Sequence, residues 1–306
     1  MFYLLNPFII DRRNEINTRK ASIIHENSNK YKLLIAPISK NRAKFIVESK
    51  NRKYAYDIYH IIKAYYYFVG ETGGNYDFSK SICVYEYNKL PLVSWKKNDW
   101  YSNLNKEVHI IEPNDWLYHN IEIQSGDLVT INESLKEFIN SYFERDNIIE
   151  SVNSLIQSRN LFDGEIDNNF PNQRYREPTV IISANQEERI YFENRCKLEL
   201  SYLAAFKGLE LLFNVNSIKK ENIDEMLIKF NDGNDGNSFY YRKHEIKVGL
   251  IKLISVRQLI KHFLDIRNTV GAHGNKNPPF SKRVSMYAIY EIQDFLENRL
   301  LAKLNI

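Results

Sequence analysis

The stretch "NQEERIYFENRCKLELSYLAAFKGLELLF", residues 185–213, decides the fold class of the C-terminal half of the chain. Its apolar side chains recur every three or four residues, which places them on one face of a helix with 3.6 residues per turn. The residues on that face are Tyr191, Leu198, Tyr202, Ala205, Leu209 and Leu212. The spacing therefore predicts one long amphipathic helix that needs partners to cover its apolar face.

Three more helices are predicted downstream of this one. They cover residues 217–230, 247–273 and 282–304. Ser217 is the expected N-cap of the first, and a polar loop over residues 231–245 separates the first from the second. Four helices in this order predict a small antiparallel bundle, so we interpret residues 180–306 as an all-α four-helix domain.

The N-terminal half has a mixed pattern of strands and helices. Short aromatic or β-branched runs predict strands: "KYKLLIAPI" at 30–38, "AKFIVES" at 43–49 and "SICVYEY" at 81–87. The opening "MFYLLNPFIIDRR" is interpreted as a buried strand, because it is too short to span a membrane and has no basic leader. Residues 54–70 are apolar or aromatic nearly all round, which predicts a helix buried on more than one face.

A domain boundary is expected near residues 165–180. Helical spacing over 132–160 gives way to "LFDGEIDNNFPNQRYREP", residues 161–178, which is rich in Asn, Pro and charge and is typical of a linker. The prediction is thus an α+β protein with a mixed strand and helix domain at 1–165 and the helical bundle at 180–306.

Composition limits the function classes only weakly. The formal net charge of +4 permits an anionic partner without requiring one. Cys83 and Cys196 lie far apart and outside any Cys/His cluster, so no disulfide framework and no zinc site is expected. We expect a cytoplasmic protein without a membrane segment, a metal or a cofactor.

The segment "DIRNTVGAHGNKNPP", residues 265–279, carries the candidate catalytic residues Arg267, Asn268 and His273. Spacing alone is weak support, because Arg precedes His by four to six residues twice more, at Arg19 and His25 and at Arg257 and His262. The third occurrence differs in its context. Asn follows the Arg directly, small residues flank the His, and a helix here meets a Gly/Pro loop.

Helical geometry places Arg267 at the end of an apolar stripe. At about 100° per residue, Val256, Ile260, Phe263 and Arg267 share one side of the helix. On an unbroken helix His273 would lie roughly 120° away from Arg267. The two side chains converge only if Gly271 loosens the last turn of the helix, or if a second copy of the chain brings its own Arg and His to the same site.

These residue types suit cleavage of RNA without metal. A neutral imidazole can accept the proton of a ribose 2′-hydroxyl, because an unperturbed His titrates near pKa ~6.5. The hydroxyl then attacks the adjacent phosphate, whose growing charge a planar guanidinium stabilises with paired hydrogen bonds. Asn268 would hold the phosphate or orient the imidazole, and a His from a second chain would protonate the leaving 5′-oxygen.

A structural explanation of the same residues remains open. His near a helix C-terminus interacts with the last carbonyls, and Gly274 after it is an ordinary cap. Arg267 would then pair with an acid such as Glu210, which lies in the otherwise apolar end of the first long helix. Nearby Lys276, Lys282 and Arg283 either attract RNA or are solvated surface charges.

Residues 183–303 resemble the HEPN superfamily in the order of their helices and in an Arg-Asn-x4-His motif whose His precedes Gly. The resemblance implies a four-helix bundle that dimerises so that two motifs face each other. It also implies a metal-independent endoribonuclease, commonly a toxin or an antiviral, abortive-infection effector acting on transfer, messenger or viral RNA. Arg267 and His273 would be its catalytic pair and Asn268 the supporting polar residue.

Two other functions remain open. Some members of this superfamily are non-catalytic and serve as dimerisation or partner-binding modules, for example toward an antitoxin or an activator. Residues 1–165, which the resemblance does not cover, would be a sensor, a recognition module or an inhibitory cover over the cleft. In a third hypothesis they are the functional centre and the bundle is their adaptor.

Overall fold

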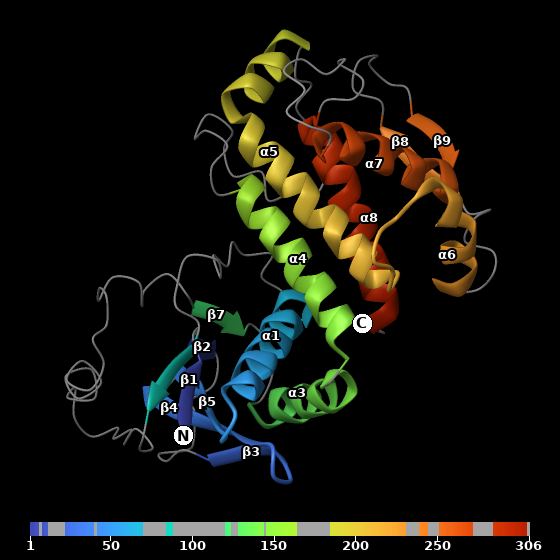
Figure 1. The fold of residues 1–306 in the computed structure, drawn as a ribbon. Coiled ribbons are helices and arrows are strands. Elements are labelled where there is room, and N and C mark those ends of the chain that lie inside the picture. Colours follow the sequence, from blue (N-terminus) through green and yellow to red (C-terminus); the bar gives the residue numbers. More distant parts are fainter. Residues whose placement is uncertain are drawn as a thin grey trace. The chain divides into compact units, whose positions relative to one another are not determined.

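The chain is an α+β protein made of two compact units, Met1–Ile149 and Glu150–Ile306 (Figure 1). The computed structural model describes residues 1–5, 8–11, 22–39, 42–69, 84–87, 120–123, 128–143, 145–163, 184–230, 239–243, 251–271 and 284–304. Most of the predicted linker, residues 161–178, lies outside these described residues. The α+β class predicted from the sequence is confirmed.

The N-terminal unit contains a sheet of seven described strands. They are β1 (Phe2–Leu5), β2 (Phe8–Asp11), β3 (Ser22–Asn27), β4 (Tyr31–Ser39), β5 (Arg42–Glu48), β6 (Val84–Tyr87) and β7 (Asn120–Ile123). The main strand order is β3-β4-β5-β1-β6, and β2 pairs with both β5 and β7. All pairs are antiparallel except β2 with β7, which is parallel. The predicted strands at 30–38, 43–49 and 81–87 are present as β4, β5 and β6.

The opening segment forms an inner strand of this sheet, as predicted. Strand β1 lies between β5 and β6, with Leu4 opposite Ile46 on one side and Tyr85 on the other. Tyr3 and Leu5 are almost fully buried, at 2% and 1% exposure. The segment is not one strand, however, because β2 follows β1 as a separate strand.

Helix α1 (Arg52–Val69) confirms the helix predicted at 54–70 and is buried on several sides. Its buried apolar residues occur at one-, two- and three-residue intervals: Ala55, Ile58, Tyr59, Ile61, Ile62, Ala64 and Tyr65. Helix α3 (Leu128–Tyr142) packs against α1, where the ring of Phe138 lies 5.4 Å from that of Tyr65. The tyrosine-rich face of α1 therefore contributes to the core of the N-terminal unit.

The helical spacing predicted at 132–160 corresponds to two helices, α3 and α4 (Asp146–Asp163), and Phe143 at the end of α3 is in a turn. The two compact units divide within this region, between Ile149 and Glu150, earlier than the boundary predicted at 165–180. Most of α4 belongs to the C-terminal unit because its small polar side chains bond to α5. Ser151 Oγ donates to the carbonyl of Gly208 at 2.7 Å.

The C-terminal unit is mainly helical. Besides α4 it contains α5 (Ala184–Leu212), the 3-10 turn η2 (Lys220–Asn222), α6 (Ile223–Phe230), α7 (Val256–Gly271) and α8 (Met286–Leu304). Helix α5 is the predicted long helix, although Asn194 is non-helical and divides it. Of the predicted apolar face, Leu198, Tyr202, Ala205, Leu209 and Leu212 are buried. The predicted N-cap Ser217 is wrong, since the helical backbone begins at Lys220.

The C-terminal unit is not all-α, so that part of the predicted fold is corrected. Strands β8 (Phe239–Lys243) and β9 (Ile251–Ser255) form an antiparallel pair, with Tyr241 opposite Leu253. Residues 239–243 were expected in a polar loop and 251–255 in a helix. Both runs are rich in aromatic or β-branched residues, which suit a half-buried strand.

Candidate functional site

The candidate site is built on helix α7, and a capping box sets where that helix begins. The backbone N–H of Gln258 donates to Ser255 Oγ at 3.3 Å, and the N–H of Ser255 donates to Gln258 Oε1 at 3.1 Å. These two bonds satisfy backbone donors that the first turn of a helix leaves without partners. The helix therefore starts at Val256 rather than at residue 247.

The apolar stripe predicted on α7 is present and packs into the C-terminal unit. Val256, Ile260 and Phe263 are buried to 1% exposure or less. The hydroxyl of Tyr202, on α5, donates to the carbonyl of Phe263 at 2.9 Å. The turn of α7 that precedes Arg267 is thus held on α5 by packing and by a buried hydrogen bond.

Arg267 continues this stripe at the rim of the core, with 35% of its side chain exposed. Its Nη1 donates to Asn268 Oδ1 at 3.1 Å. Its guanidinium carbon lies 5.5 Å from the centre of the buried Phe206 ring, within the range of a cation–π contact. A guanidinium has five N–H donors, and among the described residues only one of its nitrogens donates a hydrogen bond.

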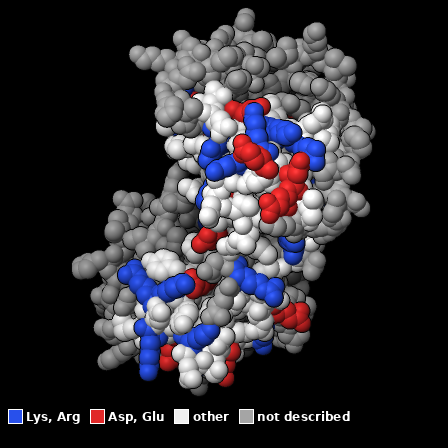
Figure 2. All heavy atoms as spheres, turned by 45° about the vertical axis from the view of Figure 1, so that its right-hand side comes forward, with Lys and Arg blue, Asp and Glu red and all other residues white. Residues whose placement is uncertain are grey.

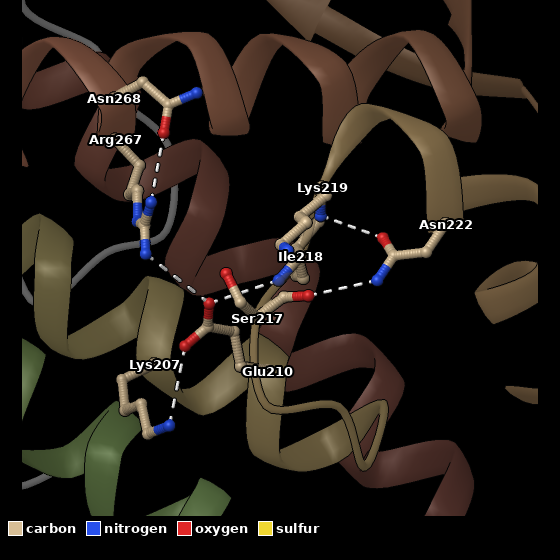
Figure 3. A network of polar contacts seen from close by, with 8 residues as sticks. All are labelled: Lys207, Glu210, Ser217, Ile218, Lys219, Asn222, Arg267 and Asn268. Carbon is tan, nitrogen blue, oxygen red and sulfur yellow. Dashed lines mark hydrogen bonds and ion pairs between the residues drawn. The ribbon is translucent and has the colours of Figure 1, made fainter.

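The acid opposite Arg267 is Glu210, the partner that the structural explanation of the motif suggested. Arg267 Nη2 lies 3.9 Å from Glu210 Oε1, close enough for an ion pair but too far for a hydrogen bond (Figure 3). Only 7% of the Glu210 side chain is exposed. Lys207 Nζ lies 3.5 Å from the other oxygen, Oε2. One buried carboxylate therefore has a cation at each oxygen.

Glu210 is fixed by the loop that follows α5. The backbone N–H of Ile218 donates to Glu210 Oε1 at 3.2 Å, and the N–H of Val215 donates to the Glu210 carbonyl at 2.9 Å. Asn222 holds the next part of the loop, accepting from Lys219 N at 2.8 Å and donating to the carbonyl of Ser217 at 3.0 Å (Figure 3). The carboxylate is therefore part of the loop structure as well as a counter-ion.

Other charges of α7 are paired with the segment that includes α6. Arg257 Nε lies 2.6 Å from Asp224 Oδ1, and Asp265 Oδ1 lies 3.0 Å from Lys220 Nζ. Figure 2 shows acidic and basic side chains interspersed on this face of the C-terminal unit. Arg257, which also precedes a His at similar spacing, thus has its own acidic partner in Asp224.

Two of the three predicted catalytic residues can be placed. Arg267 and Asn268 are adjacent and hydrogen-bonded at the end of α7. The third, His273, lies outside the described residues, as do the flanking Lys276, Lys282 and Arg283. Lys207 was missed by the sequence reasoning, although its position three residues before Glu210 is a spacing at which helical side chains meet.

Two kinds of feature are absent from the described residues. In that part of the chain, no group of three or more His, Cys, Asp or Glu side chains could hold a metal ion. Within the same ranges, none of the helices combines the length and the apolar character that crossing a membrane requires. Neither a protein-family model, nor a curated protein, nor a solved structure matches this chain significantly.

Proposed function

We propose that this chain is a metal-independent endoribonuclease of the HEPN type, with Arg267, Asn268 and His273 as its catalytic residues. The observation that carries the proposal is the orientation of the Arg267 guanidinium and the number of its N–H donors that remain available. Its guanidinium is oriented by Asn268 and Phe206 at the exposed end of α7, while most of its N–H donors make no hydrogen bond to a described residue. A phosphate group is the ligand that this planar donor set suits best.

The mechanism follows from the chemistry of these side chains. His273 as a neutral imidazole accepts the 2′-hydroxyl proton, and the 2′-oxygen attacks the adjacent phosphorus. The bond from phosphorus to the 5′-oxygen breaks, leaving a 2′,3′-cyclic phosphate and, after protonation by an imidazolium, a 5′-hydroxyl. Arg267 stabilises the negative charge that develops on the phosphoryl oxygens, and Asn268 holds the guanidinium in place.

The biological setting proposed with this activity is antiphage defence or growth arrest in the cytoplasm. A homodimer formed through the C-terminal helices would bring two motifs together, and an antitoxin or activator would control it. Transfer, messenger and viral RNA are the candidate substrates. The N-terminal unit would act as a sensor, a recognition module or an inhibitory cover.

A second candidate function is a non-catalytic module that binds a partner or dimerises. One observation favours it: Arg267 already has a counter-ion in Glu210 and an aromatic contact in Phe206. These contacts give the arginine a structural role that does not depend on RNA. In this alternative, replacing His273 changes no RNA-directed activity.

The two candidates separate in one experiment. Purified wild-type chain and the His273→Ala variant are incubated with total RNA in EDTA. The nuclease proposal predicts cleavage by the wild type and a loss of at least about 100-fold in the variant, the usual contribution of a general base. The control is His262→Ala, which removes a His from α7 five residues after Arg257, compared with the six residues that separate His273 from Arg267.

Two outcomes would contradict the nuclease proposal. If wild type and His273→Ala cleave alike, or if neither cleaves RNA, the catalytic role of His273 is wrong. Loss of activity in His262→Ala to the same degree would point to damage of the helix rather than removal of a catalytic group. Circular dichroism of all three proteins checks that the helices are intact.

A further inference from the structure

A second cation, Lys207, contacts the same carboxylate as Arg267. Glu210 Oε1 faces Arg267 Nη2 at 3.9 Å and Oε2 faces Lys207 Nζ at 3.5 Å (Figure 3). The three formal charges sum to one positive charge. This grouping joins α5 and α7, since Lys207 and Glu210 are on α5 and Arg267 is on α7.

Both cations are accessible, whereas the carboxylate between them is not. The side chains of Lys207 and Arg267 are 54% and 35% exposed, compared with 7% for Glu210. An anion arriving from solvent therefore meets the ammonium and the guanidinium before it meets the carboxylate. Among these three side chains, the charge exposed to solvent is therefore mainly positive.

The contacts of the two cations with Glu210 are long, so they are readily exchanged for better ones. At 3.9 Å the Arg267 contact is not a hydrogen bond, and at 3.5 Å the Lys207 contact is at the outer limit of one. Charge-assisted hydrogen bonds to a phosphate oxygen are typically about 2.7–2.9 Å. A phosphate bound to both groups would thus make shorter hydrogen bonds than the contacts that Glu210 provides.

Glu210 itself does not follow the cations outward. Its Oε1 accepts the N–H of Ile218 at 3.2 Å, a bond buried within the unit. Leaving that backbone donor without an acceptor would be unfavourable by about 1–3 kcal/mol. The negative charge therefore stays in place, opposing an incoming anion while it holds one cation at each of its oxygens.

We propose that Lys207 and Arg267 form a binding site for a phosphodiester group of an RNA strand, and that Glu210 is the resident counter-ion which weakens binding there. The choice of RNA as the ligand rests on the proposed function, but binding is separable from cleavage. Lys207 is then a second contact to the RNA backbone. Glu210 sets how tightly the strand is held.

The experiment measures binding of an RNA oligonucleotide that cannot be cleaved because every 2′-position is O-methylated. Fluorescence anisotropy gives Kd at several salt concentrations for the full-length chain. Lys207→Ala should weaken binding several-fold and reduce the slope of log K against log salt by about 0.7, the value for one lost contact to a single strand. Lys261→Ala, which removes an exposed lysine from α7, is the control. It should change the affinity and the salt slope less than Lys207→Ala does.

Glu210→Gln removes the charge but keeps an oxygen for the Ile218 N–H. It should tighten RNA binding by roughly threefold to tenfold at low salt, with a smaller gain at high salt. The matched control is Glu297→Gln, another buried glutamate, which pairs with Arg159 at 2.8 Å and should leave RNA binding unchanged.

Three results would overturn the inference: Lys207→Ala behaves like Lys261→Ala, Glu210→Gln fails to tighten binding, or the wild type does not bind the oligonucleotide. Tight binding of O-methylated RNA with the predicted effects of both variants, together with no cleavage of unmodified RNA, would support the site while contradicting the proposed nuclease. The two claims therefore fail separately.

Discussion

Arg267 and Glu210 face each other across 3.9 Å, and the carboxylate of this pair also accepts the backbone N–H of Ile218 at 3.2 Å. The ion pair and the hydrogen bond of Glu210 contribute differently to the free energy of unfolding. An ion pair with a partly exposed arginine contributes little, about 0–1 kcal/mol, because solvent screens it. The buried hydrogen bond to the loop matters more.

This difference leads to the first prediction, which concerns stability. Glu210→Ala should lower the free energy of unfolding by about 1–3 kcal/mol, since it leaves the Ile218 N–H without an acceptor. Glu210→Gln should lose clearly less, because an amide oxygen can replace the carboxylate oxygen. Urea denaturation followed by circular dichroism measures both. Equal losses for the two variants would show that the charge, and not the hydrogen bond, stabilises the loop.

The second prediction concerns Gly208, where α5 is crossed closely by α4 and α8. A Cβ at this position would lie 2.6 Å from Leu296 Cδ2 and 3.3 Å from the carbonyl oxygen of Ser151. Overpacking of this kind typically costs about 1–3 kcal/mol, while alanine gains about 1 kcal/mol in helix propensity. Gly208→Ala should therefore reduce the unfolding free energy by about 1 kcal/mol.

A double mutant tests the cause of that loss. Leu296→Ala removes the side chain that Gly208→Ala would crowd, so the two changes together should destabilise the protein by less than the sum of the single changes. Urea titrations of the four proteins give the coupling. Additive effects would mean that the alanine at 208 does not meet Leu296.

The third prediction tests the start of α7. Ser255→Ala removes the acceptor of the Gln258 N–H and should reduce the unfolding free energy by about 1 kcal/mol, the usual loss at an N-cap. Thr269→Val on the same helix is the control, because its hydroxyl only bonds back to the Asp265 carbonyl at 2.9 Å. A thermal melt in which the valine variant loses more than the alanine variant would argue against the capping box.

The fourth prediction concerns the geometry of the Arg267 cation. Arg267→Lys keeps the positive charge but loses the planar donor pair, so RNA cleavage should fall by roughly 10- to 100-fold. Arg257→Lys serves as its control, because Arg257 is paired with Asp224 at 2.6 Å and lies on the first turn of α7. Initial rates of RNA cleavage in EDTA are compared for the wild type and the two variants. Full activity in Arg267→Lys would mean that a point charge suffices.

Regular elements with strong patterns were predictable from the sequence. The helix at 54–70 and the strands at 30–38 and 43–49 are present as α1, β4 and β5. Their burial pattern follows from side-chain spacing, which is a local property. Long apolar periodicity also located α5, although it did not reveal the break at Asn194.

The β8–β9 pair was not predicted because its evidence is not local. The run "IKLIS" at 251–255 directly precedes a helical pattern and can be interpreted as either a strand or a helix. Residues 251–255 form a strand because they pair with residues 239–243. Ser255 and Gln258 form a capping box that was visible in the sequence and marks the helix start.

The candidate site was predictable only in part. The stripe ending at Arg267 follows from helical spacing, and Glu210 could be named as a possible partner because it interrupts an apolar face. The role of Ile218 in holding Glu210 depends on the fold of the loop after α5 and could not be read from spacing. The same is true of the cation pair formed by Lys207 and Arg267 across one carboxylate.

The most direct test of the account is the chemistry of the RNA ends. After the cleavage site has been mapped in EDTA, the same RNA is prepared with one 2′-deoxyribose on the 5′ side of the scissile phosphate. The proposed mechanism predicts 2′,3′-cyclic phosphate ends on the unmodified RNA and no cleavage at the deoxy position. Cleavage that persists at that position, or that requires an added divalent metal, would contradict attack by the 2′-hydroxyl.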